Sequence, residues 1–591
     1  MSHKKSIAMA LAIFAVVSAA AAAEKVADLK PLYREGQVFL TFKELPDVQG
    51  EKYAVYRCDQ PITAGALSKA VRMAVIDEDS GSYKAEQRVK VLGNKTKVPN
   101  YNFRYIIQDN PTNDPAAQLG EGVGLFVYTV KSDGKRHYAV VPVIGGKETP
   151  ALMAATEEPV EVKATVPGAV MVWKSPMGAG FVYTHWMDGE TWDPFCEGNA
   201  YNFGVGLPEK YDGKSALPVM FYGHGMSGTY SAPDKTSYGS SLWVWHGDKT
   251  GSWFLGVMNA AKDRVVNYAE QRVRWSAEWL KAARANQPWK VDMTHVNAHG
   301  HSMGGTGNND WGLRMGDIFC ITVDSAGATI HSRNKVWVGQ ASKLWGPVDK
   351  DLPLETRRYD YSGGKLTITH TNAGGVWSKY QNYAQWSLDH MGQDTAWMTI
   401  SHGKRDGSVV FEPVPDFLDA LQKSKRPFAA MWNMRGHSWS GYGTKNGGWG
   451  KFSLKVDETI PALSNASNND DPRTRDSGQI NGKLEWSSSG NNFDRKSTAD
   501  DWVDSTGMWA MNIRAIAGEA TVDVTPRKAQ KFKTTPGARY DWENISFADP
   551  ANPTKVDSGT VTADKDGLVT VAKFKVGSAG LGNRLVIQPA R

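Results

Sequence analysis

Several short motifs in this sequence could together carry nucleophilic catalysis. Residues 300–304 read Gly-His-Ser-Met-Gly and match G-x-S-x-G, with Ser302 between two glycines. A serine hydroxyl attacks a carbonyl carbon only when a tight strand-to-helix turn exposes it and a nearby base removes its proton. The stretch 296–299 leads directly into the motif and predicts the strand that such a turn requires. We therefore take Ser302 as the candidate nucleophile.

A candidate acid and a candidate base lie further along the chain. Asp406 follows the apolar stretch 397–401, and His437 follows the apolar stretch 428–432. The resulting order is Ser, Asp, His, and the 31 residues that separate Asp406 from His437 leave room for one helix and one strand. In such a triad His437 takes the proton of Ser302, while Asp406 holds the imidazole in the correct tautomer.

A serine nucleophile also needs two N–H donors for the oxyanion that forms when it attacks. The residue after the nucleophile usually supplies one of them, which points to Met303. The stretch 221–226 ends in a His-Gly pair followed by Met226, directly after an apolar strand. We expect Met226 to supply the second N–H, with Gly225 as the alternative. If Asp406 is not the acid, Glu412 and Asp416 are the next candidates.

Three further histidines lie close to these motifs in sequence, namely His224, His299 and His301. None of them follows a late strand, so packing or hydrogen bonding near the site is their expected role. The chain has neither an H-E-x-x-H motif nor a paired-cysteine pattern. We therefore expect no metal ion and no cofactor.

The pattern of apolar and polar segments along the sequence predicts the domains that position these residues. Residues 24–157 are rich in short β-branched and aromatic runs and resemble a fibronectin type III or immunoglobulin-like sandwich. Residues 158–462 alternate apolar strands with helical stretches, which predicts an α/β-hydrolase fold, a mainly parallel sheet with helices on both faces. The polar stretch 463–476 is expected to be a linker, and residues 477–591 a second β-sandwich.

The first residues and the composition indicate export. Lys4 and Lys5 precede an apolar run and an alanine-rich end, which predicts a signal peptide over residues 1–23 with cleavage before Glu24. The chain has 591 residues, a net charge of +6 and no dense block of basic residues, so nucleic-acid binding gains no support. We expect a secreted protein that does not associate with a membrane after cleavage. Its three cysteines, Cys58, Cys196 and Cys320, allow one disulfide at most.

The segment from residue 206 to His437 resembles secreted α/β-hydrolases of the polyhydroxybutyrate depolymerase, feruloyl esterase and polyester hydrolase kind. The features that carry the resemblance are Leu207–Pro208, His224–Gly225, Val291–Asp292, the motif at 300–305, Asp406 and His437. This resemblance implies an α/β-hydrolase fold and a Ser-His-Asp mechanism. Ser302 and Asp406 are 104 residues apart, which is longer than usual in compact members. The extra residues, about 331–393, are expected to form a cap or lid.

These observations favour a serine carboxylic ester hydrolase that acts through an acyl-enzyme. The expected substrate is a polymeric ester, either a polyester such as a polyhydroxyalkanoate or an aromatic polyester, or a feruloyl or acetyl ester of the plant cell wall. Trp377 and Trp439 are candidate substrate contacts, and the sandwiches could hold polymer, because aromatic faces stack on sugars and aromatic acyl groups. The alternatives are a prolyl-oligopeptidase-like serine peptidase and a non-catalytic polymer-binding protein. Residues 24–157 are too few for the propeller of such a peptidase.

Overall fold

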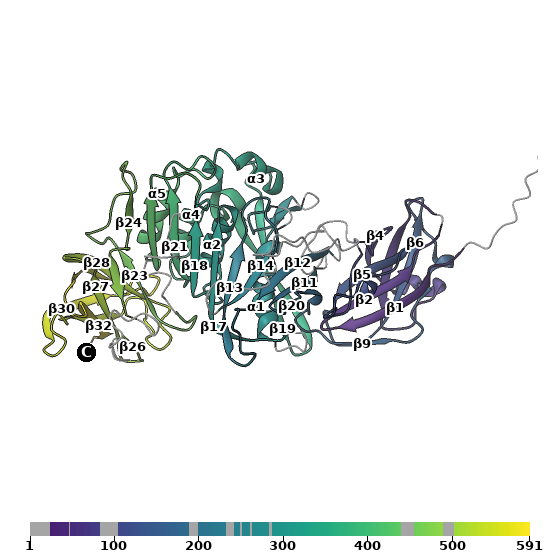
Figure 1. Cartoon of the computed structure of the whole chain (residues 1–591), viewed down its shortest axis with the longest axis horizontal. Coiled ribbons are helices and arrows are strands. Elements are labelled where there is room, and N and C mark those ends of the chain that lie inside the picture. Colours follow the sequence, from purple (N-terminus) through teal and green to yellow (C-terminus); the bar gives the residue numbers. More distant parts are fainter. Residues whose placement is uncertain are drawn as a thin grey trace, which may run out of the picture.

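The computed structural model describes residues 24–46, 48–82, 104–187, 199–231, 241–248, 251–259, 263–282, 287–438, 454–487 and 502–590. The expected signal peptide, Cys196 and Trp439 lie outside the described residues. Figure 1 shows three parts in a row, with a β-sandwich at either end of a central sheet that carries helices. No helix of the described residues is long and apolar enough to span a membrane.

A ten-stranded sheet forms the middle of the molecule. Its order is β10 (Val170–Lys174), β11 (Gly180–Met187), β12 (Asn199–Gly206), β14 (Leu242–His246), β13 (Ala216–Gly223), β17 (Lys290–His301), β18 (Ile321–Ser325), β21 (Trp397–Gly403), β22 (Phe428–Asn433) and β24 (Gly478–Ile480). The strands from β14 to β22 are parallel, while β10 to β12 and β24 join antiparallel. The mainly parallel sheet predicted from the sequence is confirmed.

The strands of this sheet are buried on both faces, which explains their nearly continuous apolar sequences. In β14, which reads Leu-Trp-Val-Trp-His, all five residues are buried. Successive side chains point to opposite faces. Leu242 and Val244 therefore enter one core, while Trp243 and Trp245 enter another.

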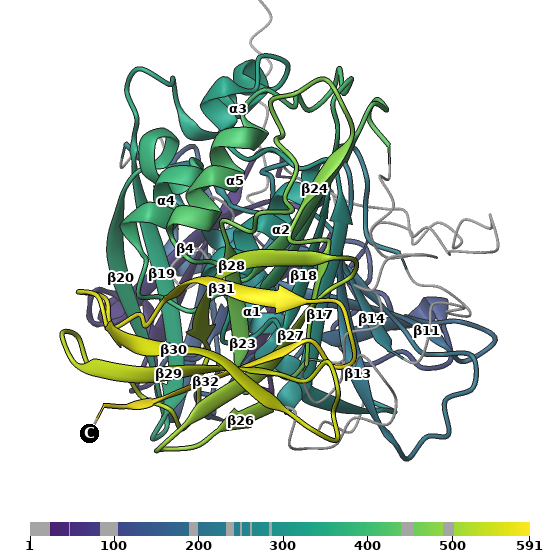
Figure 2. The same ribbon diagram turned by 90° about the vertical axis from the view of Figure 1, so that its left-hand side faces the viewer.

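Helices cover the first of these faces. They are α1 (Tyr268–Lys281), α2 (Met303–Arg314), α4 (Tyr383–Asp389) and α5 (Val414–Lys423). Val273, Ala277 and Leu280 of α1 share the main core, as their helical spacing predicts. Helices α4 and α5 lie side by side (Figure 2) and close a neighbouring core over β21 and β22.

The opposite face carries no α-helix among the described residues, so the prediction of helices on both faces is wrong, and the N-terminal sandwich covers part of that face instead. Its sheets are β1 (Ala27–Arg34), β2 (Gln37–Lys43) and β5 (Val123–Thr129), and, facing them, β3 (Lys52–Cys58), β4 (Val71–Asp77), β6 (Gly134–Ile144), β7 (Lys147–Glu148), β8 (Ala154–Ala155) and β9 (Val160–Val162). Phe39 and Val127 of the first sheet pack against the central sheet, where Phe39 meets Trp186 edge-on at 5.1 Å. Because β9 pairs with β6, this sandwich extends beyond residue 157, the predicted boundary.

The C-terminal sandwich covers the same face further along. Its sheets are β23 (Ile460–Ser464), β28 (Glu519–Arg527) and β31 (Val571–Gly577), and β25 (Leu484–Trp486), β26 (Trp502–Asp504), β27 (Trp509–Ala515), β29 (Arg539–Ser546), β30 (Thr554–Thr562) and β32 (Asn583–Pro589). Its core is continuous with Ile321, Trp397 and Ala429 of the central sheet. The rings of Trp397 and Trp486 lie 5.0 Å apart across the junction.

The stretch 463–476 is not the interdomain linker that its polar sequence predicts. It begins within β23, a strand of the sandwich, and leads to β24, which is the edge strand of the central sheet. The chain thus enters the sandwich, returns to the sheet and enters the sandwich again. The polar side chains have structural partners, since Asp470 accepts from Gln479 N at 3.0 Å and Asn469 accepts from Asn481 N at 2.8 Å.

The insertion 331–393 forms helices and a hairpin. It contains α3 (Val338–Trp345), β19 (Pro353–Ser362), β20 (Lys365–Gly375), η5 (Val376–Tyr380) and α4. The hairpin extends a four-stranded sheet that begins with β15 (Val257–Asn259) and β16 (Arg264–Val266). Trp377 is only 2% exposed, and its indole N–H donates to Gly346 O at 3.1 Å. The prediction that Trp377 contacts substrate is therefore wrong, because this side chain belongs to the core.

The shared core predicts that damage to the C-terminal sandwich also weakens the central sheet. We expect Trp486→Ala to lower the free energy of unfolding by about 3–5 kcal/mol, the usual cost of deleting a buried aromatic ring. Hydrogen–deuterium exchange should rise in β21 as well as in the sandwich. The control is Val556→Ala on β30, where the side chain is 53% exposed. Unchanged exchange in β21 of the Trp486 variant would show that the sandwich is an independent module.

Candidate active site

Ser302 occupies a strained turn between β17 and α2. Its φ of 61° and ψ of −121° lie in a region that non-glycine residues rarely adopt. Its N–H donates to Ser325 O at 2.8 Å, and its carbonyl accepts the first hydrogen bond of α2 from Thr306 N at 3.0 Å. The turn therefore joins the end of one strand, the next strand and the start of a helix.

The glycines after Ser302 are required by close packing. A Cβ on Gly304 would lie 1.9 Å from Gly223 O, at the end of β13. A Cβ on Gly305 would lie 2.3 Å from the Asp324 carboxylate, at the end of β18. The first turn of α2 can therefore pack this closely against β13 and β18 only because residues 304 and 305 have no side chains.

Asp406 and His437 form a hydrogen-bonded pair. His437 Nδ1 donates to Asp406 Oδ2 at 2.6 Å, while Asp406 Oδ1 accepts from Ser408 N at 2.8 Å and Val409 N at 2.9 Å. Burial of Asp406 acts to raise its pKa, but the bonds from His437 and the two backbone N–H groups outweigh it and hold the pKa below its usual value. The carboxylate is thus ionised at neutral pH and fixes the tautomer of His437.

The fold brings this pair to the same sheet edge as Ser302. The three residues follow β17, β21 and β22, whose parallel strands end on one side. The ring of His301, which adjoins Ser302, lies 4.6 Å from the ring of His437. The hydrogen bonds among the described residues include the one from His437 to Asp406, but none from the Ser302 hydroxyl to His437. Such contacts often tighten only when substrate binds.

The two predicted oxyanion donors belong to segments close to Ser302. Met303 is the first residue of α2 and is buried. Met226 follows Gly225, where a Cβ would lie 3.8 Å from Ser302 Cβ. Only about one methyl group would therefore fit between Gly225 of this loop and the candidate nucleophile.

Sequence reasoning missed two residues that support this site. Asp324 is the penultimate residue of β18 and accepts from Asn309 Nδ2 and Gly327 N, both at 2.8 Å. Complete burial raises its pKa to about 7. The backbone carbonyl of Ser325 accepts a hydrogen bond from Ser302 N–H, and the Ser325 hydroxyl lies 3.1 Å from His301 Nδ1. Polar residues directly after the apolar run 318–323 are the signal that could have found them.

The two alternative acids point elsewhere. Glu412 and Asp416 each pair with Arg333 at 2.5 Å, and all three side chains are exposed. Asp324, although buried near the nucleophile turn, is held by groups other than His437. Asp406 is thus the acid that contacts His437 among the described residues.

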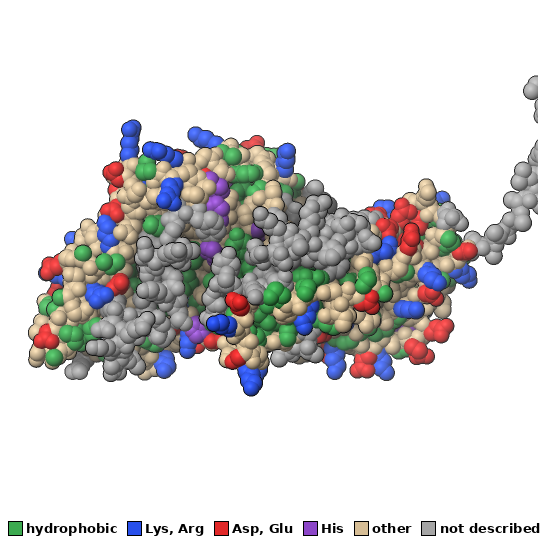
Figure 3. All heavy atoms as spheres, in the orientation of Figure 1, with side chains coloured by type: hydrophobic (Ala, Val, Ile, Leu, Met, Phe, Trp, Pro, Cys, Tyr) green, Lys and Arg blue, Asp and Glu red, His purple; other side chains and the backbone are tan. Residues whose placement is uncertain are grey.

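Histidines gather in the middle of the face shown in Figure 3, over the central part of the molecule. Burial lowers the pKa of both His299 and His301 to about 4, and the neighbouring His437 further lowers that of His301. Burial likewise lowers the pKa of His402, whose Nε2–H donates to Val409 O at 2.7 Å. These imidazoles are neutral at neutral pH. No three His, Cys, Asp or Glu side chains in the described part of the chain are placed to hold a metal ion.

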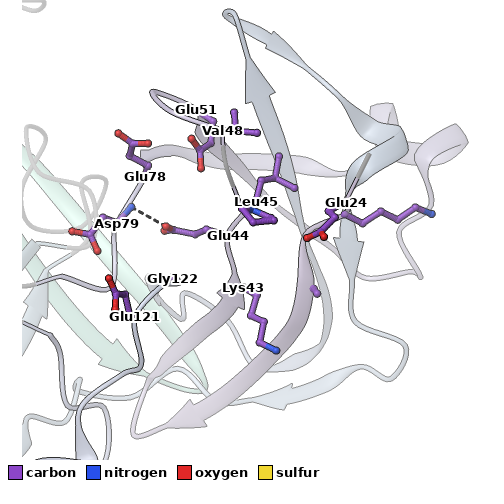
Figure 4. A pocket seen from close by; sticks show the side chains of 13 residues that line it. Glu24, Lys43, Glu44, Leu45, Val48, Glu51, Glu78, Asp79, Glu121 and Gly122 are labelled. Carbon is purple, nitrogen blue, oxygen red and sulfur yellow. Dashed lines mark hydrogen bonds between the residues drawn. The ribbon is translucent and has the colours of Figure 1, made fainter. Parts of the chain in front are cut away.

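A separate cavity of about 600 Å³ lies in the N-terminal sandwich (Figure 4). Acidic side chains dominate its lining, but the sandwich's own groups engage them. Glu44 accepts from Asp79 N at 3.0 Å and Ser80 N at 3.3 Å, and the Asp79 carboxylate pairs with Arg104 at 2.8 Å. None of the predicted catalytic residues lines this cavity.

No protein-family model and no curated protein match the sequence, but solved structures match it in part. An S-formylglutathione hydrolase from Agrobacterium tumefaciens is 15% identical with a TM-score of 0.32, over 45% of this chain and 92% of its own. A fluorophosphonate-binding serine hydrolase from Staphylococcus aureus is 15% identical with a TM-score of 0.30, over 44% and 93%. A putative dipeptidyl aminopeptidase IV from Bacteroides ovatus is 11% identical with a TM-score of 0.31, over 70% and 54%. At such low TM-scores, the fold of this chain rests on its own strand order.

The buried histidines predict a loss of stability in acid. Burial lowers the folded-state pKa of His185, His224, His246, His299, His301, His331 and His402. An unfolded histidine titrates near pH 6.5, so the unfolded chain binds more protons between about pH 6.5 and 4. This stability is present above about pH 6.5 and is lost as the pH falls toward about 4.

Urea unfolding at pH 7 and pH 5 checks this expectation. The midpoint should be lower at pH 5, and His299 alone should account for about 2 kcal/mol of the difference. In the variant His299→Asn the difference between the two pH values should shrink. An equal or higher midpoint at pH 5 in the wild type would contradict the account.

Proposed function

We propose that this chain is a secreted serine hydrolase that cleaves carboxylic esters through an acyl-enzyme. One observation carries the proposal. The Asp406–His437 pair, joined at 2.6 Å, lies at the sheet edge where Ser302 occupies a strained strand-to-helix turn. A Ser-His-Asp triad needs this arrangement of acid, base and nucleophile on any fold.

In the first half of the reaction Ser302 Oγ attacks the ester carbonyl carbon while its proton passes to His437 Nε2. Asp406 keeps the other imidazole nitrogen protonated and stabilises the imidazolium. The carbonyl oxygen becomes an oxyanion, for which Met303 N–H and Met226 N–H are the proposed donors. The tetrahedral intermediate then collapses. His437 returns the proton to the departing alcohol, and the acyl group stays on Ser302.

In the second half water replaces the alcohol. His437 removes a proton from the water as it attacks the acyl carbon, and the oxyanion forms again at the same donors. Collapse of this intermediate breaks the bond to Ser302 Oγ. His437 gives its proton to the serine, and the carboxylic acid leaves.

Ester cleavage is preferred over peptide cleavage because of what surrounds the site. The described residues between 24 and 162 form a two-sheet sandwich rather than the repeated four-stranded blades of a propeller. The proposal of an inert, polymer-binding protein is weaker, since a binding module gains nothing from the strained φ of Ser302.

We retain a polymeric ester as the proposed substrate and export as the proposed localisation. The abundance of tryptophan gives only weak support to a polymeric substrate. The sequence has 22 tryptophans, and eleven of them are among the largest fully buried side chains. Tryptophan is therefore mainly a core residue here. Polyesters and plant-wall esters are both proposed as substrates because the resemblance from residue 206 to His437 includes enzymes of both kinds.

Two substitutions separate the proposed roles. Ser302→Ala should abolish ester hydrolysis without unfolding the protein, because it removes the nucleophile. Asp406→Asn should lower kcat by about 10⁴-fold, because the amide does not hold the required tautomer of His437. Steady-state kinetics on p-nitrophenyl butyrate measures both, with circular dichroism as the check on folding.

Asp416→Asn is the matched control for the acid, since Asp416 pairs with Arg333 and is exposed. It should leave kcat unchanged. If Asp416→Asn were inactive and Asp406→Asn fully active, the acid would be misassigned. Hydrolysis by a pure Ser302→Ala variant near the wild-type rate would reject the nucleophile.

The substrate class predicts a further result. Wild-type enzyme should release p-nitrophenol from short p-nitrophenyl esters and ferulate from methyl ferulate, but little p-nitroaniline from dipeptide p-nitroanilides. The ratio of kcat/KM between ester and anilide is the measurement. A higher kcat/KM for the anilides would favour the peptidase alternative.

A further inference from the structure

His224 makes two hydrogen bonds that define its tautomer. Its Nδ1 lies 2.7 Å from Gly225 O, and a carbonyl oxygen only accepts, so Nδ1 carries the proton. Its Nε2 accepts from Asp248 N at 2.8 Å, so Nε2 carries none. Both bonds exist together only in the neutral Nδ1–H form. Burial, which lowers the pKa of His224, favours the same form.

The bond to Gly225 O fixes the peptide that carries a proposed oxyanion donor. Gly225 O and Met226 N belong to one planar trans peptide, whose C=O and N–H point in opposite directions. Gly225 O also accepts from Gly228 N at 2.9 Å. With two donors on its carbonyl, this peptide cannot rotate freely, and the Met226 N–H is directed to the other side of the loop.

That peptide lies next to the candidate nucleophile. A Cβ on Gly225 would be 3.8 Å from Ser302 Cβ and from His301 O. A Cβ on Gly304, in the first turn of α2, would be 3.0 Å from His224 O. The His224 loop is thus packed directly against the turn that carries Ser302.

His224 is also held in place by Asp248 and by the neighbouring residues 251–254, whose backbone is strained. The Asp248 carboxylate accepts from Ser252 Oγ and Phe254 N, both at 3.0 Å. Trp253 and Phe254 are consecutive residues with positive φ, 58° and 62°, and the ring of Phe254 lies 5.3 Å from that of His224. Such strain persists only where the surroundings hold it, and it is often found at functional sites.

This loop also contacts the insertion. The indole N–H of Trp253 donates to Gln340 Oε1 of α3 at 3.0 Å. Gln340 Nε2 donates back to Gly251 O at 3.3 Å, so the two segments are joined in both directions. A continuous set of contacts therefore runs from α3 through residues 251–254 and His224 to the Gly225–Met226 peptide.

We propose that His224 is a positioning residue whose Nδ1–H orients the Gly225–Met226 peptide, so that the Met226 N–H meets the oxyanion formed at Ser302. This inference rests on the proposed function. The residue touches neither substrate nor the reacting atoms. Its effect is therefore confined to the transition state and appears in kcat rather than in KM.

Two conservative variants separate positioning from packing. In His224→Asn the side-chain amide N–H replaces Nδ1–H toward Gly225 O. In His224→Gln the longer amide oxygen replaces Nε2 toward Asp248 N, and the donor to Gly225 O is lost. We expect kcat to fall about 100-fold in the Gln variant and less than about 10-fold in the Asn variant, with KM of both within about threefold of wild type.

A boronic acid inhibitor supplies a second readout, because it forms a negatively charged tetrahedral adduct on serine. Its inhibition constant should rise in the Gln variant by the factor by which kcat/KM falls. Equal losses in the Asn and Gln variants, or losses in KM alone, would overturn the inference. A wild-type protein that neither cleaves esters nor binds the boronate would overturn the proposed function instead.

If either variant does not fold, a crystal structure of the wild-type boronate adduct decides. The inference requires a boronate oxygen within hydrogen-bond distance of Met226 N, with His224 Nδ1 still on Gly225 O. An adduct whose oxygen meets other donors while His224 keeps that bond would overturn it.

Discussion

The strained backbone of Ser302 is the constraint on which the rest of the site depends. A positive φ at a non-glycine residue costs about 1–3 kcal/mol, so the surrounding structure must hold it. Here the turn is fixed by the N–H bond to Ser325 O and by the contact of Gly304 with the end of β13. These contacts exist because β13, β17 and β18 are adjacent parallel strands that end at one edge. The register of the sheet therefore determines where the hydroxyl stands.

The same sheet has two different kinds of cover. One face packs against helices, while the two sandwiches contribute apolar residues to the other face through Phe39 and Trp486. The C-terminal sandwich is tied in further because the chain leaves it at β23, adds β24 to the central sheet and then returns. The sandwiches are thus structural parts of the central sheet, which accounts for their presence without polymer binding.

Short-range signals in the sequence identified the elements that carry the site. The apolar runs before Asp406 and His437 are the strands β21 and β22. Each of these depends on a periodicity that a single element satisfies by itself. The pairing of Asp406 with His437 also followed, because parallel strands place their ends together.

The misjudged features depend on contacts between distant segments. Trp377 is buried because the insertion packs into the main core, which composition alone does not reveal. The polar stretch 463–476 resembles a linker in sequence because its hydrogen-bond partners lie in elements that sequence patterns do not connect to it.

The central claim is that Ser302 is the residue that becomes acylated. The most direct measurement is peptide mass mapping after reaction with a fluorophosphonate, which transfers its phosphonyl group to an activated serine as fluoride leaves. The account predicts one modified peptide, with the added mass on Ser302, and no modification once Asp406 is replaced by asparagine and labelling is brief. Stable labelling of another serine, with Ser302 unmodified, would contradict it.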